Sequence, residues 1–264
     1  MKKVCAIVMA LCLLLAGLCP ALAEDKTYRI GICQLAPHPA LDAATQGFRD
    51  FLTEKLGDKV VFDEQNAAGE AATCMQIMNS FISEDVDLIM ANATASLQAA
   101  QSATGDIPIL GTAVTDYGVA LDLTCVDGKT GVNISGTSDL APLDQQAAMI
   151  KELFPEAKEV GLLYCSSEAN SAYQIEVMTQ ELTKLGFRCT EFAFSDSSDV
   201  TSMTSTACQN SDVIYVPTDN VVATCAEAIR NVAEVDRVPI IAGEEGACAG
   251  CGVATLSISY YELG

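Results

Sequence analysis

Short apolar runs alternate along this chain with longer segments whose apolar residues have helical spacing. The runs at residues 28–33 (YRIGIC), 60–64 (VVFDE) and 86–91 (VDLIMA) are typical of buried strands, and the segments between them are predicted to be helices. Strands that alternate with amphipathic helices indicate a parallel sheet built from βαβ units. The first part of the chain is therefore predicted to form an α/β lobe.

The alternation stops over residues 116–142, which are rich in Gly, Ser, Thr and Asp, and it resumes afterwards. A polar, glycine-rich stretch of this kind is typical of a connection rather than a core element. We therefore expect an α/β fold with two lobes, an N-terminal lobe over residues 24–115 and a C-terminal lobe over 143–250. Residues 116–142 are expected to be the hinge or crossover, and 251–264 a returning strand and the start of a further segment.

The first 23 residues have the layout of a secretory signal peptide. A basic start (MKK) precedes an apolar run and the small residues Ala21 and Ala23, which flank Leu22 at a cleavage site. A membrane anchor is the alternative, but the apolar run is short and no later stretch reaches about 18 apolar residues. We therefore expect export to the periplasm or the exterior, with cleavage before Glu24.

The net charge excludes one class of partner. The formal charge of the whole chain is -21, and loss of Lys2 and Lys3 with the signal peptide lowers it to -23. Such a surface repels nucleic acid and anionic lipid, so we expect no nucleic-acid partner.

Nine of the twelve cysteines remain after cleavage, so in an oxidising compartment at least one thiol stays unpaired. Cys248 and Cys251 form a C-x-x-C pair in a glycine-rich segment, and a short-range disulfide is possible there. A zinc site would need a second pair or histidines, and His38 is the only histidine of the chain. No metal and no cofactor are expected.

The segment 166–171 (SSEANS) lies between a predicted strand and a predicted helix. In open parallel sheets, ligands bind beyond the carboxyl ends of the strands, where helix N-termini offer free N–H groups. Helix capping alone would need one residue, whereas this loop has four suitable ones. We therefore expect ligand contacts from Ser166, Ser167, Asn170 and Ser171.

Two other loops at predicted strand ends carry acids, namely Asp219 and the pair Glu244–Glu245. A buried carboxylate is costly unless it meets a cation such as a ligand ammonium, whereas hydroxyls and helix N-termini suit a ligand carboxylate. Together these groups fit a zwitterion. For each acid taken singly, a solvated loop position remains an equal alternative.

The strings YVPTDN, VPIIAGEEG and VATLSISYYELG, in that order, resemble the ABC-transporter substrate-binding proteins of the tryptophan-binding type. AVTD and GVNISGTSD in the middle of the chain are similar to the same family. The resemblance implies a type I periplasmic-binding-protein fold, in which two Rossmann-like lobes hold a small solute in the cleft between them. It also implies an amino-acid-like ligand, possibly aromatic, a membrane ABC permease as partner, hinge closure and a monomer.

By position, the resemblance places ligand contacts in the loops that hold Gln34, Thr94, Thr115, Asn170, Ser171, Asp219 and Glu245. The segment ACAGC departs from the family pattern, so the disulfide is expected to fix the shape of the loop with Glu244 and Glu245. In the family, a helix opens at YYELG and further elements follow. The chain is therefore expected to be a C-terminally truncated form.

Two other function classes compete with this interpretation. Cys33 and Cys165 end the first predicted strand of each lobe, and two thiols across a cleft are similar to those of cofactor-independent amino-acid racemases. The signal peptide argues against such an enzyme, and we expect none. A sensory domain that reports ligand occupancy to a membrane receptor is the other alternative, and the sequence does not separate it from a transport protein.

Overall fold

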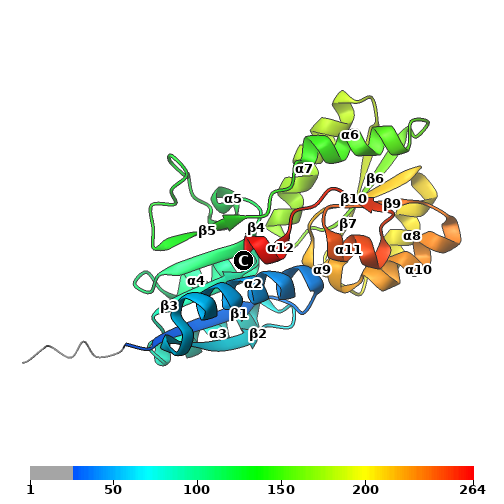
Figure 1. The fold of residues 1–264 in the computed structure, drawn as a ribbon. Coiled ribbons are helices and arrows are strands. Elements are labelled where there is room, and N and C mark those ends of the chain that lie inside the picture. The colour runs from blue at the N-terminus through cyan, green and yellow to red at the C-terminus, as the bar shows by residue number, and fades with distance from the viewer. Residues whose placement is uncertain (1–25) are drawn as a thin grey trace, which may run out of the picture.

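A computed structural model describes residues 26–264, which form two α/β lobes beside each other (Figure 1). Each lobe is built on a five-stranded sheet whose paired strands are all parallel. This architecture confirms the predicted fold class. Within residues 26–264, no helix is long and apolar enough to cross a membrane.

The N-terminal lobe has the strand order β2-β1-β3-β4-β5. Its strands are β1 (Tyr28–Gln34), β2 (Val60–Asn66), β3 (Leu88–Asn92), β4 (Ile109–Val114) and β5 (Ile134–Ser138). Its helices are α2 (Pro39–Leu56), α3 (Ala71–Ser83), α4 (Thr94–Ala103), α5 (Tyr117–Leu121) and α12 (Tyr260–Leu263), with a 3-10 turn over Gly57–Lys59. The helices cover both faces of the sheet, and side chains such as Phe81 and Leu97 are fully buried between the layers.

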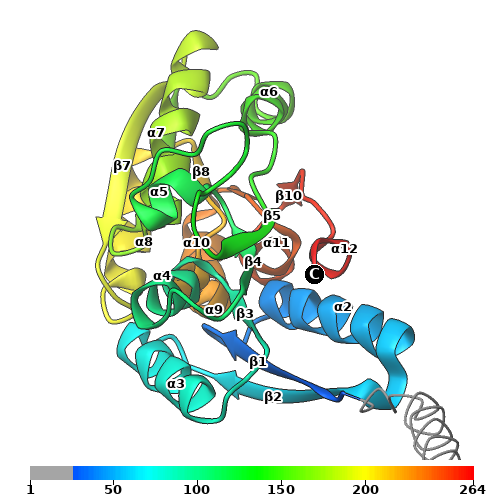
Figure 2. The same cartoon turned by 90° about the vertical axis from the view of Figure 1, so that its left-hand side faces the viewer.

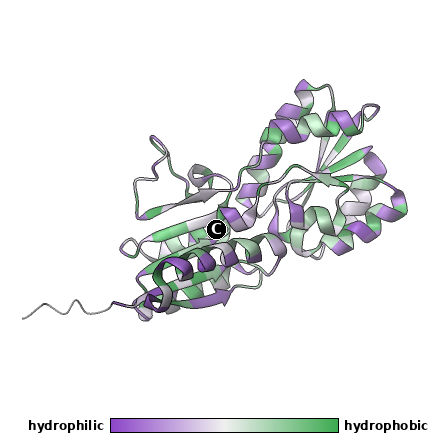
Figure 3. Cartoon of the chain, in the orientation of Figure 1, coloured by the Kyte–Doolittle hydropathy of each residue, from purple (hydrophilic) through white to green (hydrophobic). Residues whose placement is uncertain are grey.

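The C-terminal lobe has the strand order β10-β9-β8-β6-β7. Its strands are β6 (Glu159–Cys165), β7 (Arg188–Phe194), β8 (Val213–Val216), β9 (Ile240–Ala242) and β10 (Ala254–Thr255). Its helices are α6 (Leu143–Leu153), α7 (Ala169–Lys184), α8 (Val200–Asn210), α9 (Asn220–Thr224), α10 (Ala226–Asp236) and α11 (Glu245–Cys251). Figure 3 shows the hydrophobic strands in the middle of each lobe and hydrophilic residues on the outer sides of the helices.

Two segments connect the lobes. Residues 139–142 lead from β5 to α6, and residues 256–259 lead from β10 back to α12, which packs against α2 (Figure 2). The hinge is therefore shorter than the predicted 116–142, because β5 within that range pairs with β4 and belongs to the N-terminal sheet. Within the predicted segment 251–264, β10 is the strand and α12 is the helix that begins at YYELG, and α12 packs on the N-terminal lobe.

The carboxyl ends of the strands of both sheets face the boundary between the lobes. His38, which follows β1, contacts Asn220, which follows β8, and Thr115, which follows β4, contacts Gln174 of α7. In open parallel sheets this edge is where ligands bind. The fold therefore brings two such edges together.

Candidate functional site

A small cavity lies between the two lobes, next to both connecting segments. Residues of the N-terminal lobe, the C-terminal lobe and the connections all contribute to its wall. It is lined by His38, Leu41, Ala113, Asp139, Asn170, Thr218, Asp219, Asn220, Ala223, Glu244 and Tyr260. Its volume is about 10 Å³, which is close to the space of a single water molecule. The lobes are therefore closed on each other.

Three buried carboxyl groups line this cavity, and two of them hold helix N-termini. Asp219 accepts hydrogen bonds from the backbone N–H of Val222 (2.8 Å), as the N-cap of α9, and of Cys165 (2.7 Å). Burial, and secondarily the charge of Glu168, raises the pKa of Asp219 to about 7. Both oxygens of Asp219 therefore already have backbone partners.

Glu244 has the equivalent position at the end of β9. It is the N-cap of α11, and its two oxygens accept the backbone N–H groups of Gly246 and Ala247. The loops after β8 and β9 approach closely at Gly243, where an added Cβ would lie 2.7 Å from the backbone N of Thr218. Glycine at this position thus lets Glu244 lie beside the loop of Asp219.

Asp139 differs from the other two acids because it caps no helix. It lies at the start of the first connecting segment, and its Oδ2 accepts a hydrogen bond from the hydroxyl of Tyr260 (2.9 Å), which follows the second segment. Its Oδ1 is buried and has no hydrogen-bond partner within residues 26–264. Burial raises the pKa of Asp139 and outweighs the hydroxyls of Tyr260 and Thr115, which lower it.

A chain of hydrogen bonds joins the lobes at His38. Its Nε2 donates to Oδ1 of Asn220 (3.1 Å), and Nδ2 of Asn220 donates to Glu168 (2.6 Å). Glu168 also accepts from Nδ2 of Asn170 (3.1 Å). Because His38 belongs to one lobe and the other three residues to the other, the contact with Asn220 exists only when the lobes are closed.

A second, smaller cavity adjoins the first one at Asn170, and in the closed form it leaves no space for a water molecule. It is lined by Thr94, Asp116, Val119, Ala120, Asn170 and Tyr173. Thr94 is the first residue of α4, and Asn170 is in the first turn of α7, so free N–H groups of two helices lie near this cavity. Gln174 of α7 donates to the hydroxyl of Thr115 (3.3 Å), which ties the lobes together here.

The structure places only part of the predicted site in these cavities. Thr94, Asn170 and Asp219 line them. Thr115 and Ser171 are buried and lie next to the cavities. The hydroxyl of Thr115 accepts a hydrogen bond from Gln174, and the hydroxyl of Ser171 accepts one from Nδ2 of Asn170 (3.3 Å).

Four predicted residues lie elsewhere. Gln34 is buried but bonds within its own lobe, to Ala36, Asp42 and Thr45. Ser166 and Ser167 are exposed, and their hydroxyls donate to the backbone at the end of β7. Glu245 is exposed, because Glu244 is the member of the pair whose side chain turns inward to cap α11.

The sequence interpretation missed Asp139, His38, Asn220 and Tyr260 as site residues. Asp139 and Tyr260 lie in or next to the connecting segments, where no strand end marks them. His38 follows the first predicted strand in a loop that did fit the rule for strand ends, so that rule could have identified it. Asn220 directly follows Asp219 and could have been found in the same way.

All nine cysteines within residues 26–264 carry free thiols. Cys248 and Cys251 lie on the helix α11, not on a loop, so the predicted loop shape is wrong, and their pairing stays a prediction. Cys33 and Cys165 are fully buried, and neither lines the cavities between the lobes. Burial raises the pKa of the Cys165 thiol, which makes it less reactive. In the described part of the chain, no group of three or more His, Cys, Asp or Glu residues is placed to hold a metal ion.

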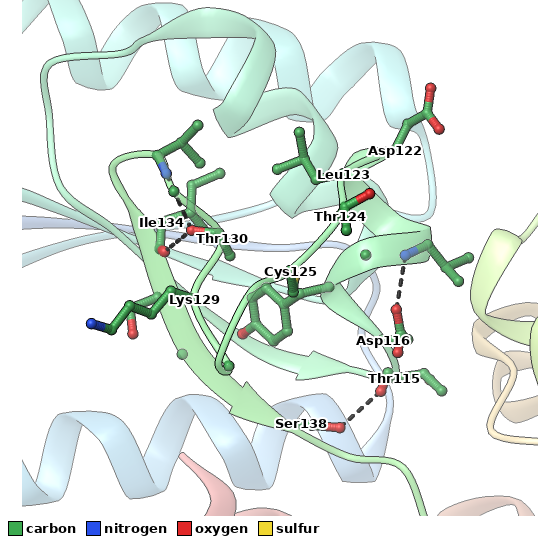
Figure 4. Close-up of a pocket in the computed structure, with 18 of the residues that line it drawn as sticks. Thr115, Asp116, Asp122, Leu123, Thr124, Cys125, Lys129, Thr130, Ile134 and Ser138 are labelled. Carbon is green, nitrogen blue, oxygen red and sulfur yellow. Dashed lines mark hydrogen bonds between the residues drawn. The ribbon is translucent and has the colours of Figure 1, made fainter.

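A larger hollow lies outside the cleft, on the N-terminal lobe. It has a volume of about 1080 Å³ and lies between β5 and the loop over residues 122–133. Figure 4 shows Cys125, Lys129 and Thr130 on that loop and Ser138 on the strand side. This hollow is open, and the C-terminal lobe contributes no residue to it. We therefore assign the candidate ligand site to the cavities between the lobes.

Comparisons with known proteins identify the family of this chain. Residues 29–264 match the family model described as ABC transporter substrate binding protein. A tyrosine-binding protein from Clostridioides difficile (strain R20291) is 40% identical over 244 residues, which cover 91% of this chain and 70% of that protein. The match is to a family of binding proteins and decides against the racemase alternative.

Two solved structures differ in how well they superpose. The ABC domain in complex with L-Trp from Streptococcus pneumonia is 31% identical and has a TM-score of 0.87. The ligand-free, open structure of a substrate binding protein with adhesive properties from Clostridium difficile is 39% identical and has a TM-score of 0.65. Each alignment covers 90% of this chain and 81% of the other. The closed lobes of this chain are therefore arranged more like those of the L-Trp complex.

Proposed function

Because the chain belongs to the ABC transporter substrate-binding protein family, we propose that it is the extracytoplasmic solute-binding component of an importer. We propose further that it binds a small amino-acid-like ligand between its two lobes. The observation that carries this proposal is the pair of adjoining cavities between the lobes, which together have three buried carboxyl groups and the N-termini of the helices α4 and α7 in their walls. Such a combination suits the two charged ends of a zwitterion.

The two cavities suit opposite charges of the ligand. The buried carboxyls of Asp139, Asp219 and Glu244 favour a cation at the first cavity. The starts of α4 and α7, with Thr94, Asn170 and the neighbouring Ser171 and Thr115, favour a carboxylate. Tyr173 of the second cavity offers an aromatic ring to the ligand side chain. An aromatic amino acid is the ligand that the names of the tyrosine-binding and L-Trp-bound relatives suggest.

Ligand entry requires the lobes to separate, because the closed cavity is close to water-sized. The bonds from His38 to Asn220 and from Gln174 to Thr115 are the contacts that would break on opening. A ligand that contacts both lobes binds the closed form better than the open form and so shifts the equilibrium toward closure. We propose that an ABC permease in the membrane receives the ligand from the closed form.

Export follows from the proposed role and has its own test. The expected cleavage site after Ala23 lies outside the described residues, and cleavage there would make Glu24 the first residue. Mass spectrometry of the exported protein should give that terminus. A protein found outside the cytoplasm that retains residues 1–23 would contradict cleavage at this site.

A thermal-shift screen of the twenty amino acids tests the proposed function. A ligand at a hundred times its dissociation constant should stabilise the folded state by about 2.7 kcal/mol, because it binds the folded chain alone. We expect at least one amino acid, with aromatic ones first, to raise the Tm and to bind in calorimetric titration. If no amino acid raises the Tm at millimolar concentration, the proposed ligand class is wrong.

A further inference from the structure

We propose that Asp139 and His38 hold the ammonium group of the ligand, on the side of the cavity next to the connecting segments. This inference rests on the proposed function, because it assigns one end of an amino-acid ligand to particular atoms. It differs from the expectation drawn from the sequence, in which Asp219 or Glu245 binds the ammonium. Both residues line the first cavity, His38 from the loop before α2 and Asp139 from the segment after β5.

The hydrogen bonds of the other acids leave them less suited to this role. Each oxygen of Asp219 accepts a backbone N–H, and so does each oxygen of Glu244. These bonds hold the two carboxylates at the N-termini of α9 and α11, and the N–H groups stabilise their negative charge. A ligand ammonium would have to compete with partners that belong to the fold.

Asp139 has the complementary property. Its side chain is 3% exposed, and Oδ2 accepts from Tyr260, but Oδ1 has no hydrogen-bond partner within the described residues. An unpartnered buried carboxylate oxygen is costly, and a cation with an N–H donor removes that cost. The hydroxyl of Thr115 is near enough to lower the pKa of Asp139 but makes no hydrogen bond to Oδ1, which leaves one strong acceptor in the cavity wall unpaired.

His38 supplies a second acceptor of the same kind. Nδ2 of Asn220 donates to the carboxylate of Glu168, so Oδ1 of Asn220 faces His38 and can only accept. Nε2 of His38 must therefore carry a proton, and in the tautomer with a single ring proton Nδ1 has a free lone pair. Nδ1 is buried and has no hydrogen-bond partner within residues 26–264, and His38 as a whole is 7% exposed.

The charges of the wall favour an ammonium over a neutral donor such as a phenol or an indole N–H. The residues that line the cavity include three acids, and none of those residues is Lys or Arg. A neutral donor would satisfy one acceptor but would leave the buried negative charge uncompensated. A primary ammonium has up to three N–H donors, is compact, and brings the missing positive charge.

A cycle of variants and ligands tests the assignment. The ligands are the amino acid that binds best in the screen and its des-amino analogue, which lacks only the ammonium. Asp139→Asn should weaken binding of the amino acid at least about 30-fold, as expected for the loss of one partner of a buried charge pair. It should change binding of the analogue less than about threefold. Asp219→Asn is the matched control and should weaken both ligands by the same factor.

A second measurement uses the wild-type protein and so does not depend on the folding of the variants. His38 is the only histidine, so the imidazole ¹⁵N spectrum contains one ring. Saturation with the amino acid should move the Nδ1 resonance from that of a free lone pair toward that of a hydrogen-bonded nitrogen. The des-amino analogue, added at the same concentration, should leave the resonance unchanged.

Several results would overturn the assignment. An unchanged Nδ1 resonance at saturating amino acid would do so, and so would equal losses for both ligands in Asp139→Asn. A loss specific to the amino acid in Asp219→Asn would move the ammonium to that residue. In all these cases the amino acid still binds the wild-type protein, so the proposed function stands. The proposed function would fail only if no amino acid bound the wild-type protein.

Discussion

Asp219 makes the stability of the ligand-free protein depend on pH, in a direction that can be worked out from its surroundings. Burial raises its pKa from the usual 3.8 to about 7. Between these two values the folded chain keeps a proton at Asp219 that the unfolded chain has lost. Stability falls with rising pH wherever the folded state binds more protons, so the contribution of this group is largest at acid pH and is lost up to about pH 7.

The size of the effect follows from the width of this interval. Each pH unit in which the two states differ by one proton is worth about 1.4 kcal/mol. From about pH 5 to about pH 8, the two states differ by close to one proton over roughly two units, so the loss is about 3 kcal/mol. Asp219→Asn keeps an amide oxygen for the N–H of Val222 but has no acceptor for the N–H of Cys165, so it should be less stable at every pH. Because the amide cannot ionise, this loss should not add a pH dependence.

Urea unfolding of both proteins at several pH values measures this contribution. The free energy of unfolding of the parent should fall by about 3 kcal/mol more than that of Asp219→Asn between about pH 5 and about pH 8. Glu245→Gln is the matched control, since it removes an exposed acid and should follow the parent within about 0.5 kcal/mol. Parallel curves for the parent and Asp219→Asn would refute the raised pKa of this group.

Three further predictions concern the connections and the thiols. Gln146 is buried and forms hydrogen bonds with Gly243, Leu256 and Tyr215, so Gln146→Ala should lower the free energy of unfolding by about 2–4 kcal/mol. Gln145→Ala removes an exposed side chain and should change this free energy little. Similar values for both variants would contradict the role of these bonds. Gly47→Ala should speed hydrogen exchange at residues 260–264, because the added Cβ would lie 2.0 Å from the carbonyl oxygen of Tyr261. Alanine favours the helix α2 itself, but this gain does not remove the clash. Unchanged exchange would show that α12 moves to accommodate the methyl group. Non-reducing peptide mapping after export should find Cys248 and Cys251 joined, and two alkylated thiols would contradict the pairing.

The two-lobed α/β architecture could be predicted because apolar runs and amphipathic helices alternate strictly along the chain. The same rule failed at β5, where only Ile134 is buried and the other four residues are exposed. An edge strand with a single buried side chain lacks the apolar run that marks a strand. The amphipathic pattern over residues 220–235 likewise does not show the break at Cys225, where the helices α9 and α10 meet.

The candidate site could be predicted only where chemistry and strand ends coincide. Asp219 and Asn170 follow strands and do line the cavities. Glu244 and Glu245 are adjacent acids, and the sequence does not tell which of them turns inward, because that depends on where α11 begins. Asp139 and Tyr260 are 121 positions apart and meet only because both connecting segments pass the same point. No local pattern records such a contact.

The use of Asp219 and Glu244 as helix caps has a consequence for how a protein of this shape can diverge. A change at either position removes partners from backbone N–H groups and so weakens folding before it alters any ligand. Selection for stability thus restricts these two positions whatever solute is bound. Descendants that acquire a new solute are expected to substitute residues of the cleft wall whose side chains hold no backbone group, such as Tyr173 and Val119. Folding and ligand choice can therefore evolve at separate positions of the same small cavity system.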